Sequence, residues 1–162
     1  YLIRNLKAER FGKIDPDLFY RFDENRPVVE IEDGLLRKIF PPGGFLYATQ
    51  PGHAGRDLII LKASEPHLRW FHFVDAILTL CQKSGVRTIV SLGSMYDNVL
   101  HTDTVISALA SSEELLSQLK AENVNTINYK GPGAIHSTIH SEAKKRGIDC
   151  VSLWCHCPQL SL

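Results

Sequence analysis

The stretch Val86-Arg87-Thr88-Ile89-Val90-Ser91-Leu92 decides the fold class, because its dense aliphatic and β-branched residues predict a buried strand. A helical pattern precedes it from about Leu68 to Lys83, and Ser84-Gly85 ends that helix. Before the helix, the continuously apolar run Asp57 to Leu61 suits another strand that is covered on both faces. A strand, a helix and a strand in succession predict an α/β fold with a mostly parallel sheet.

The rest of the second half repeats this alternation of strand and helix. The strand over 86–92 is expected to close at Gly93-Ser94, and a further strand is expected at 105–110. The remaining predicted elements are a helix capped by Ser112 that runs through Leu119, a helix from about Ala134 to Arg146 after Gly131-Pro132-Gly133, and a last strand from Ile148 to Cys155. We therefore expect a mixed, mostly parallel sheet with helices on both faces.

The first half carries shorter elements. Apolar positions in 1–10 predict a helix that Phe11-Gly12 ends, and Asp15-Pro16 predicts the start of a short helix over 17–21. Asp33-Gly34 is a strong signal for a two-residue turn. It predicts an antiparallel hairpin of the strands 28–32 and 35–40, followed by a short strand over 45–49.

Composition limits the function classes. The chain has 162 residues, of which 44% are hydrophobic and 22% are charged, and 18 basic residues balance 18 acidic ones. This neutral balance gives no overall field that would attract nucleic acid or an anionic membrane. Four cysteines without a secreted disulfide spacing, together with no apolar run of membrane-spanning length, predict a cytoplasmic protein.

Length and chain ends set the expected domain organisation. A chain of 162 residues suits a single α/β domain over residues 1–162. It begins inside a helical pattern and stops just after a predicted strand. We therefore expect this sequence to be the interior of a longer protein.

The segment Glu65-Pro66-His67-Leu68-Arg69-Trp70 is the first candidate for a working surface. It places an acid, an imidazole, a guanidinium and an indole within six residues. In a functional interpretation Glu65 or His67 transfers a proton and Arg69 holds an anion. In a structural interpretation Glu65 or Ser64 caps the following helix, Pro66 lies in its first turn, Arg69 pairs with a carboxylate and Trp70 packs.

Three more segments are expected to share an edge of the sheet with this one. Ligands of open α/β sheets bind beyond the carboxyl ends of the strands. The four segments that leave strands or enter helices there are 64–70, 93–102, 129–133 and 154–158. The side chains within them that we single out for a ligand or a partner are Glu65, His67, Arg69, Trp70, His101, Tyr129, Gly131 and Gly133.

Each of the other motifs has a structural alternative. Tyr129 to Gly133 resembles an anion-binding loop at a helix N-terminus, but Pro132 removes one donor, so a tight turn is favoured. Cys155-His156-Cys157 suggests zinc, yet a single intervening residue and no second ligand pair favour buried or half-buried thiols. We expect no metal and no cofactor.

Histidines and one serine complete the candidates. Ser94 and His101 could act as nucleophile and base, but no Gly-x-Ser-x-Gly elbow supports this. His136 and His140 lie four residues apart on one face of a predicted helix, without the glutamate of a His-Glu-x-x-His site. They are expected to form a solvated or partner-facing stripe.

Taken together, these segments resemble the proteasome assembly chaperone family in its archaeal and bacterial branch. The matching segments are 26–34, 56–61, 65–70, 92–93, 101–102, 129–135 and 152–154. The resemblance implies a three-layer α/β/α domain similar to the phosphorylase/hydrolase fold. It also implies that an N-terminal strand and a C-terminal helical region of the domain lie outside this sequence. Members of the family are expected to be homo-oligomers, a trimer or a larger assembly, that act as chaperones for proteasome subunits.

The sequence is therefore compatible with two functions. The first is a non-enzymatic oligomeric protein that acts by protein–protein binding, and the absence of a complete catalytic motif favours it. The alternative is a small-molecule-binding protein or hydrolase-type enzyme that uses Glu65, His67 and His101 at the strand-end edge.

Overall fold

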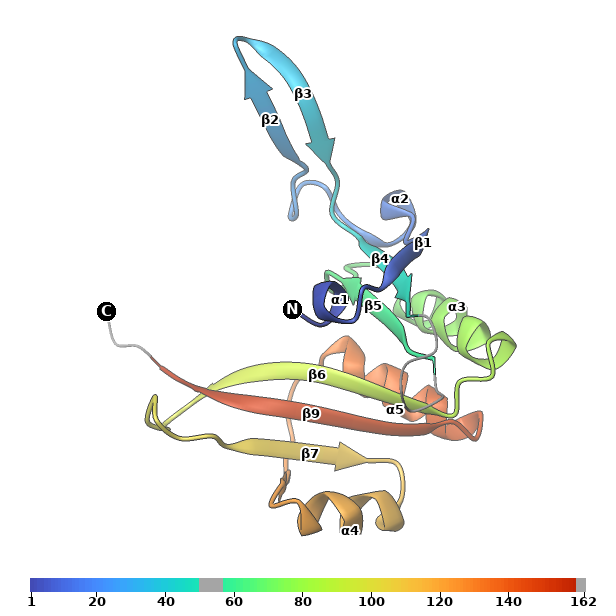
Figure 1. Cartoon of the computed structure of the whole chain (residues 1–162), viewed down its shortest axis with the longest axis vertical. Helices are drawn as coiled ribbons and strands as arrows, with labels where there is room; N and C mark the ends of the chain where they lie inside the picture. Colours follow the sequence, from blue (N-terminus) through green and yellow to red (C-terminus); the bar gives the residue numbers. More distant parts are fainter. Residues whose placement is uncertain (50–56, 160–162) are drawn as a thin grey trace. The chain divides into compact units, whose positions relative to one another are not determined.

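A computed structural model describes residues 1–49 and 57–159, and these form two compact units, residues 1–73 and 74–162. The first unit contains a three-stranded sheet in the order β1-β4-β5 and a separate two-stranded sheet of β2 and β3. The second unit contains a four-stranded sheet in the order β6-β9-β7-β8 (Figure 1). Part of the predicted strand Asp57 to Leu61 therefore lies in the antiparallel sheet of the first unit, and the expectation of a parallel neighbour there is wrong.

The helix expected over residues 1–10 is much shorter in the structure. Helix α1 covers Leu2–Asn5, and strand β1 covers Glu9–Lys13. Lys7 has a φ of 49°, and the backbone N–H of Ala8 donates to the carbonyl of Ile3. A left-handed residue of this kind ends a helix, so Lys7 plays the part that the sequence assigned to Gly12.

The short helix and the hairpin of the first unit are confirmed. Helix α2 covers Pro16–Phe19, and the Asp15 carboxylate accepts a hydrogen bond from the N–H of Asp17. Strands β2, Val28–Glu32, and β3, Leu35–Phe40, pair antiparallel. Asp33 and Gly34 both have positive φ, 51° and 75°, as a type I′ turn requires.

The remaining strands of the first unit are β4, Gly44–Ala48, and β5, Ile59–Ala63. They pair antiparallel with each other, and β4 also pairs with β1. A β-carbon on Gly44 would lie 2.4 Å from the β-carbon of Ala63, so the close pairing of these strands requires glycine there. Figure 1 shows the β2–β3 hairpin extending away from this three-stranded sheet of its own unit.

Helix α3, Trp70–Lys83, continues from the first unit into the second, which holds the longest strands. Strands β6, Thr88–Asp97, and β9, Asp149–Pro158, run parallel over their whole length. Strand β7, Ile106–Ala110, is antiparallel to β9 and parallel to the two-residue strand β8, Asn125–Thr126. The sheet is therefore mixed, as expected, although its third strand reverses direction.

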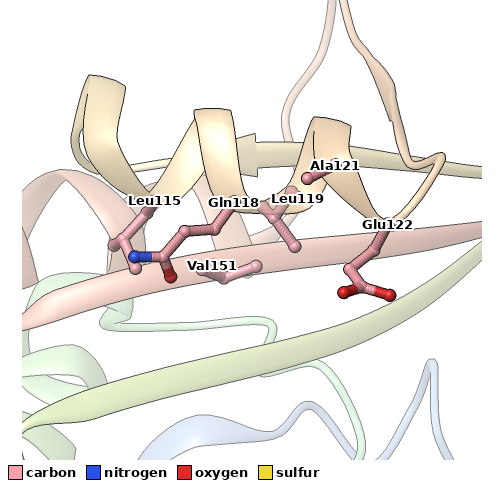
Figure 2. A pocket seen from close by; sticks show the side chains of 6 residues that line it. All are labelled: Leu115, Gln118, Leu119, Ala121, Glu122 and Val151. Carbon is pink, nitrogen blue, oxygen red and sulfur yellow. The ribbon is translucent and has the colours of Figure 1, made fainter.

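Two helices pack on opposite faces of this mixed sheet. Helix α5, Ile135–Lys145, places the His136 ring 5.5 Å from the ring of Trp154 on one face. Helix α4, Glu113–Ala121, is capped by the Ser112 hydroxyl as expected. On the other face a shallow groove lies beneath α4, with its floor on β9 (Figure 2), and its lining residues are Leu115, Gln118, Leu119, Ala121, Glu122 and Val151.

Strand β6 does not close at Gly93-Ser94 but continues through both residues to Asp97. Gly93 pairs with Trp154, and a β-carbon on Gly93 would lie 2.8 Å from the indole ring. Glycine inside a strand here permits a close approach of the ring rather than a chain break. Gly93 therefore marks a packing contact within β6 and not the end of the strand.

Candidate functional site

The segment 64–70 wraps around the end of α2 within the first unit. The backbone N–H groups of His67 and Leu68 both donate to the carbonyl of Phe19, at 2.8 and 3.0 Å. The Tyr20 hydroxyl donates to the carbonyl of Ser64 at 2.7 Å. The segment is therefore fixed mainly through its backbone.

Pro66 does not lie in the first turn of the following helix, where the structural interpretation placed it. Helix α3 begins only at Trp70, and Arg69 has a φ of 54°, so the helix does not extend back through it. The Trp70 indole N–H instead donates to the carbonyl of Pro66 at 2.6 Å, which closes the loop on itself. Arg69 makes no ion pair within the described residues, contrary to the structural interpretation of its guanidinium.

His67 has the most defined surroundings of the candidate side chains here. Its ring is half-buried, meets the Tyr20 ring at 6.0 Å in an edge-on geometry, and has Nε2 3.8 Å from a Glu24 carboxylate oxygen. Glu65 is exposed. The Tyr20 ring and the Glu24 carboxylate therefore hold His67 in a structural contact just after α2.

The strand-end edge of the mixed sheet holds an arrangement that the sequence did not reveal. The Asp97 carboxylate lies 2.6 Å from Nδ1 of His156, and Nε2 of His156 lies 2.7 Å from the hydroxyl oxygen of Ser107. These side chains come from β6, β9 and β7, so this relay of Asp97, His156 and Ser107 joins three strands. An ionised Asp97 accepts from Nδ1–H, which leaves Nε2 of a neutral ring to accept the Ser107 proton. The hydrogen bond from His156 lowers the pKa of the Asp97 carboxyl.

The relay has the connectivity of a hydrolase triad but the opposite burial. In a hydrolase the serine faces the substrate and the aspartate is buried behind the histidine. Here Ser107 is only 5% exposed, while the Asp97 side chain is 46% exposed. The serine hydroxyl is closed to a substrate and the carboxylate faces solvent. This geometry therefore favours a hydrogen-bonded link between strands over acyl transfer.

A weak sequence signal for the relay existed in the strand patterns. Ser107 and His156 are polar residues inside runs that are otherwise apolar, and Ser107 is buried. A buried polar side chain needs a partner. Pairing the two required the strand order, which places β7 beside β9 across 49 residues of sequence.

The Tyr129 to Gly133 segment forms a turn closed by its own tyrosine. The Tyr129 hydroxyl donates to the carbonyl of Pro132 at 3.0 Å. A β-carbon on Gly131 would lie 2.6 Å from that hydroxyl oxygen, so glycine leaves room for the ring. Tyr129 is 69% exposed, and Gly133 is also exposed just before α5.

The remaining histidine and cysteine predictions have mixed outcomes. His101 is exposed in the segment between β6 and β7. His140 is 8% exposed, so it does not belong to the solvated or partner-facing stripe that was expected for His136 and His140, and burial lowers the pKa of His140. The α5 face that carries His140 packs inward because Ile135, Ile139 and Ala143 share it.

Cysteine burial varies along β9. Cys155 is exposed and Cys157 is half-buried, so only Cys157 fits the buried or half-buried thiols that were expected. Cys150 is fully buried, and this burial raises the pKa of its thiol to about 11. Within residues 1–49 and 57–159, no three His, Cys, Asp or Glu side chains converge to hold a metal ion.

The β2–β3 hairpin, which we call the arm, is the most unusual surface of the described chain. All of its strand positions are exposed. Its large apolar side chains are 46–65% exposed, and they are Val28, Val29, Ile31, Leu35, Leu36, Ile39 and Phe40. Sequence reasoning identified the hairpin but not this surface, although the alternation of apolar and charged residues in 28–32 was a readable signal.

Comparisons with known proteins point to one family. The model of the PAC2 family matches residues 1–161. A crystal structure of a proteasome-assembly chaperone homologue from Mycobacterium tuberculosis is 28% identical, with a TM-score of 0.88, over 98% of this chain and 66% of that one. A PAC2 family protein from Streptomyces avermitilis is 30% identical, with a TM-score of 0.84, over 97% of this chain and 66% of that one.

More distant structures share the fold. A Pyrococcus furiosus archaeal proteasome activator is 19% identical, with a TM-score of 0.72, over 96% of this chain and 66% of that one. No curated protein matches the chain. The chain thus spans just under two thirds of the length of these solved relatives. In the described ranges no helix is long and apolar enough to cross a lipid bilayer.

Proposed function

Because this chain belongs to the PAC2 family, we propose that it is a proteasome-related assembly chaperone that acts by protein–protein binding. The observation that carries the proposal is the similarity, at 28% identity over nearly the whole chain, to a proteasome-assembly chaperone homologue. The two helices on opposite faces of a mixed sheet support a three-layer α/β/α arrangement of the phosphorylase/hydrolase type in the second unit. We place the working protein in the cytoplasm, as a homo-oligomer.

The surface chemistry of the chain supports binding of protein rather than of a small substrate. The arm exposes a set of large apolar side chains, which is typical of an interaction site. The relay of Asp97, His156 and Ser107 is closed at its serine, and the groove under α4 is shallow, with no serine, threonine, cysteine or histidine in its lining. The hydrolase alternative therefore has the connectivity of the relay in its favour, but the serine of that relay is not open to a substrate.

A binding experiment tests the proposed function. The full-length protein, tagged and expressed in its source organism, is recovered under mild conditions and its bound proteins are identified. We expect proteasome subunits of the α type to be enriched over a tagged control protein of similar size. Recovery of a folded protein without proteasome subunits, or a source genome that lacks them, would overturn the proposal.

The same experiment can test whether the candidate side chains of the segment 64–70 contact the partner. Arg69 is exposed and makes no ion pair in the described chain, so Arg69→Glu should leave the fold intact. If this segment contacts the partner, the variant recovers less of it. The exposed Arg87 serves as the matched control, because Arg87→Glu makes the same charge change outside the segment.

A further inference from the structure

The two faces of the arm differ in charge. The register pairs Val29 with Ile39 and Ile31 with Leu36, and a bulge at Arg37 keeps these four side chains on one face. Successive side chains of a strand point to opposite faces. One face of the arm is therefore entirely apolar, with its four side chains 47–62% exposed.

The opposite face carries charges that are sorted by strand. Strand β2 contributes only acids, Glu30 and Glu32, and strand β3 contributes only bases, Arg37 and Lys38. Across the hairpin, Lys38 Nζ lies 3.3 Å from a Glu30 carboxylate oxygen, and Arg37 Nε lies 3.8 Å from Glu32. The same face also carries Val28, Leu35 and Phe40, so it is mixed in character, whereas the face of Val29, Ile31, Leu36 and Ile39 has no charged side chain and is the stronger candidate for a contact.

Both edges of the arm are open within the described chain, because its sheet contains only β2 and β3. An isolated two-stranded hairpin is marginally stable in water, and open edges pair readily with further strands. One edge is acidic and the other is basic. A further strand that completes the sheet is therefore favoured when it brings bases to β2 or acids to β3.

We propose that the arm of a second copy of this chain occupies these edges, with its β3 against β2 of the first copy. This inference deepens the proposed function, on whose oligomeric form it rests. The β3-to-β2 pairing repeats between copies the acid–base pairs already present within the hairpin. Pairing of β2 with β2, or of β3 with β3, sets like charges opposite each other and is disfavoured.

The proposed contact also explains how the apolar face is covered. Joining unlike edges is a head-to-tail contact, which must close into a ring or grow into a fibre. A closed ring of arms curls the joined sheet, so Val29, Ile31, Leu36 and Ile39 of all copies face its interior. The face that carries the charges, together with Val28, Leu35 and Phe40, then lies outside.

Adjacent leucines provide a matched test on the full-length protein. Leu35 and Leu36 are 56% and 62% exposed, but they lie on the charged and the apolar face respectively. We expect Leu36→Lys to reduce the assembly to single chains in native mass spectrometry and light scattering. Leu35→Lys, the same substitution one residue away, should leave the assembly in place. Circular dichroism of both variants checks that each is folded.

A charge exchange tests the direction of pairing. Glu30→Lys with Glu32→Lys makes both edges basic, so the assembly should dissociate, most completely at low salt. Adding Arg37→Glu and Lys38→Glu to that variant reverses every pair and should restore the assembly. A double variant that stays assembled would exclude the acid-to-base pairing.

The outcomes separate this inference from the proposed function. A wild-type protein that is a single chain in solution, or a folded Leu36→Lys variant that remains assembled, would overturn the role of the arm. Proteasome subunits that still copurify in either case leave the proposed function standing. An arm-dependent assembly that recovers no proteasome subunit supports the inference and removes the function.

Discussion

The arm and the strand-end edge of the mixed sheet differ in the range of their contacts and in how far they bury their side chains. The arm has local pairing only, through a two-residue turn, and leaves apolar side chains 46–65% exposed. The strand-end edge joins strands that are distant in sequence and buries a serine at 5% exposure. The arm is therefore completed by contacts with other molecules, while the edge is completed within its own unit. Three substitutions and one pH series test this contrast.

The largest effect is expected at the strand-end edge, from Gly93→Val. The added side chain must occupy space 2.8 Å from the Trp154 ring, so either the ring or the strand moves. Overpacking of this kind costs about 1–3 kcal/mol of unfolding free energy. Urea denaturation measures the loss. Ser94→Val is the matched control, because Ser94 is the next residue of β6 and is exposed; equal losses in both variants would show that the ring contact is unimportant.

In the arm, Gly34→Val should have the next largest effect, and a local one. Gly34 has a φ of 75°, and a left-handed conformation costs a residue with a side chain roughly 1–2 kcal/mol. Hydrogen exchange should therefore speed up for the amides of β2 and β3 while the mixed sheet is unchanged. Gly34→Asn, which tolerates this conformation, is the control. Faster exchange across the second unit as well would mean that the arm is not a local element.

The buried imidazole of His140 predicts how stability depends on pH. Burial, the main cause, lowers the pKa of His140 in the folded state below the unfolded value of about 6.5. The unfolded chain then binds the proton more readily, so stability falls as pH drops below about 6.5 and is recovered above it. Denaturation midpoints between pH 5 and 8 measure this slope. His140→Gln should flatten it, whereas the same change at the exposed His72 should not.

The smallest effect is expected from Asp97→Asn in the relay. Asp97 is largely exposed, so its interaction with His156 is screened by solvent and contributes little to overall stability. The lowered pKa of Asp97 means that the stabilising contact is present above the unfolded pKa and is lost as pH falls through the folded one. The readout is the Nδ1–H proton resonance of His156, which should shift on substitution. An unchanged resonance would show that the two side chains do not share a hydrogen bond in solution.

Prediction from the sequence succeeded where local chemistry decides the outcome. Asp33-Gly34 set the hairpin with its strand boundaries, Ser112 capped α4, and Gly147, with a φ of 69°, ended α5. It failed at Tyr1 to Arg10, where a helical pattern gave way to a strand that pairs with β4. A strand partner distant in sequence outweighed the local preference there.

For the candidate site, the sequence identified segments but not their contacts. It selected Glu65 to Trp70, but it did not predict the left-handed φ of 54° at Arg69 or the helix start at Trp70. It considered Cys155-His156-Cys157 for zinc, while the structure links His156 to Asp97 and Ser107. These hydrogen bonds depend on which strands are neighbours in the sheet, and no local sequence pattern predicts that order.

The sequence by itself determined the family, the α/β alternation and the hairpin, because these depend on turn chemistry, periodicity and specific runs of residues. Tertiary structure alone decided that β7 reverses beside β9, that Gly93 accommodates an indole, and that one face of the arm is left exposed. The physical reason is that strand pairing and burial depend on contacts between residues distant in sequence. Such contacts form only when the chain folds, so no local pattern specifies them.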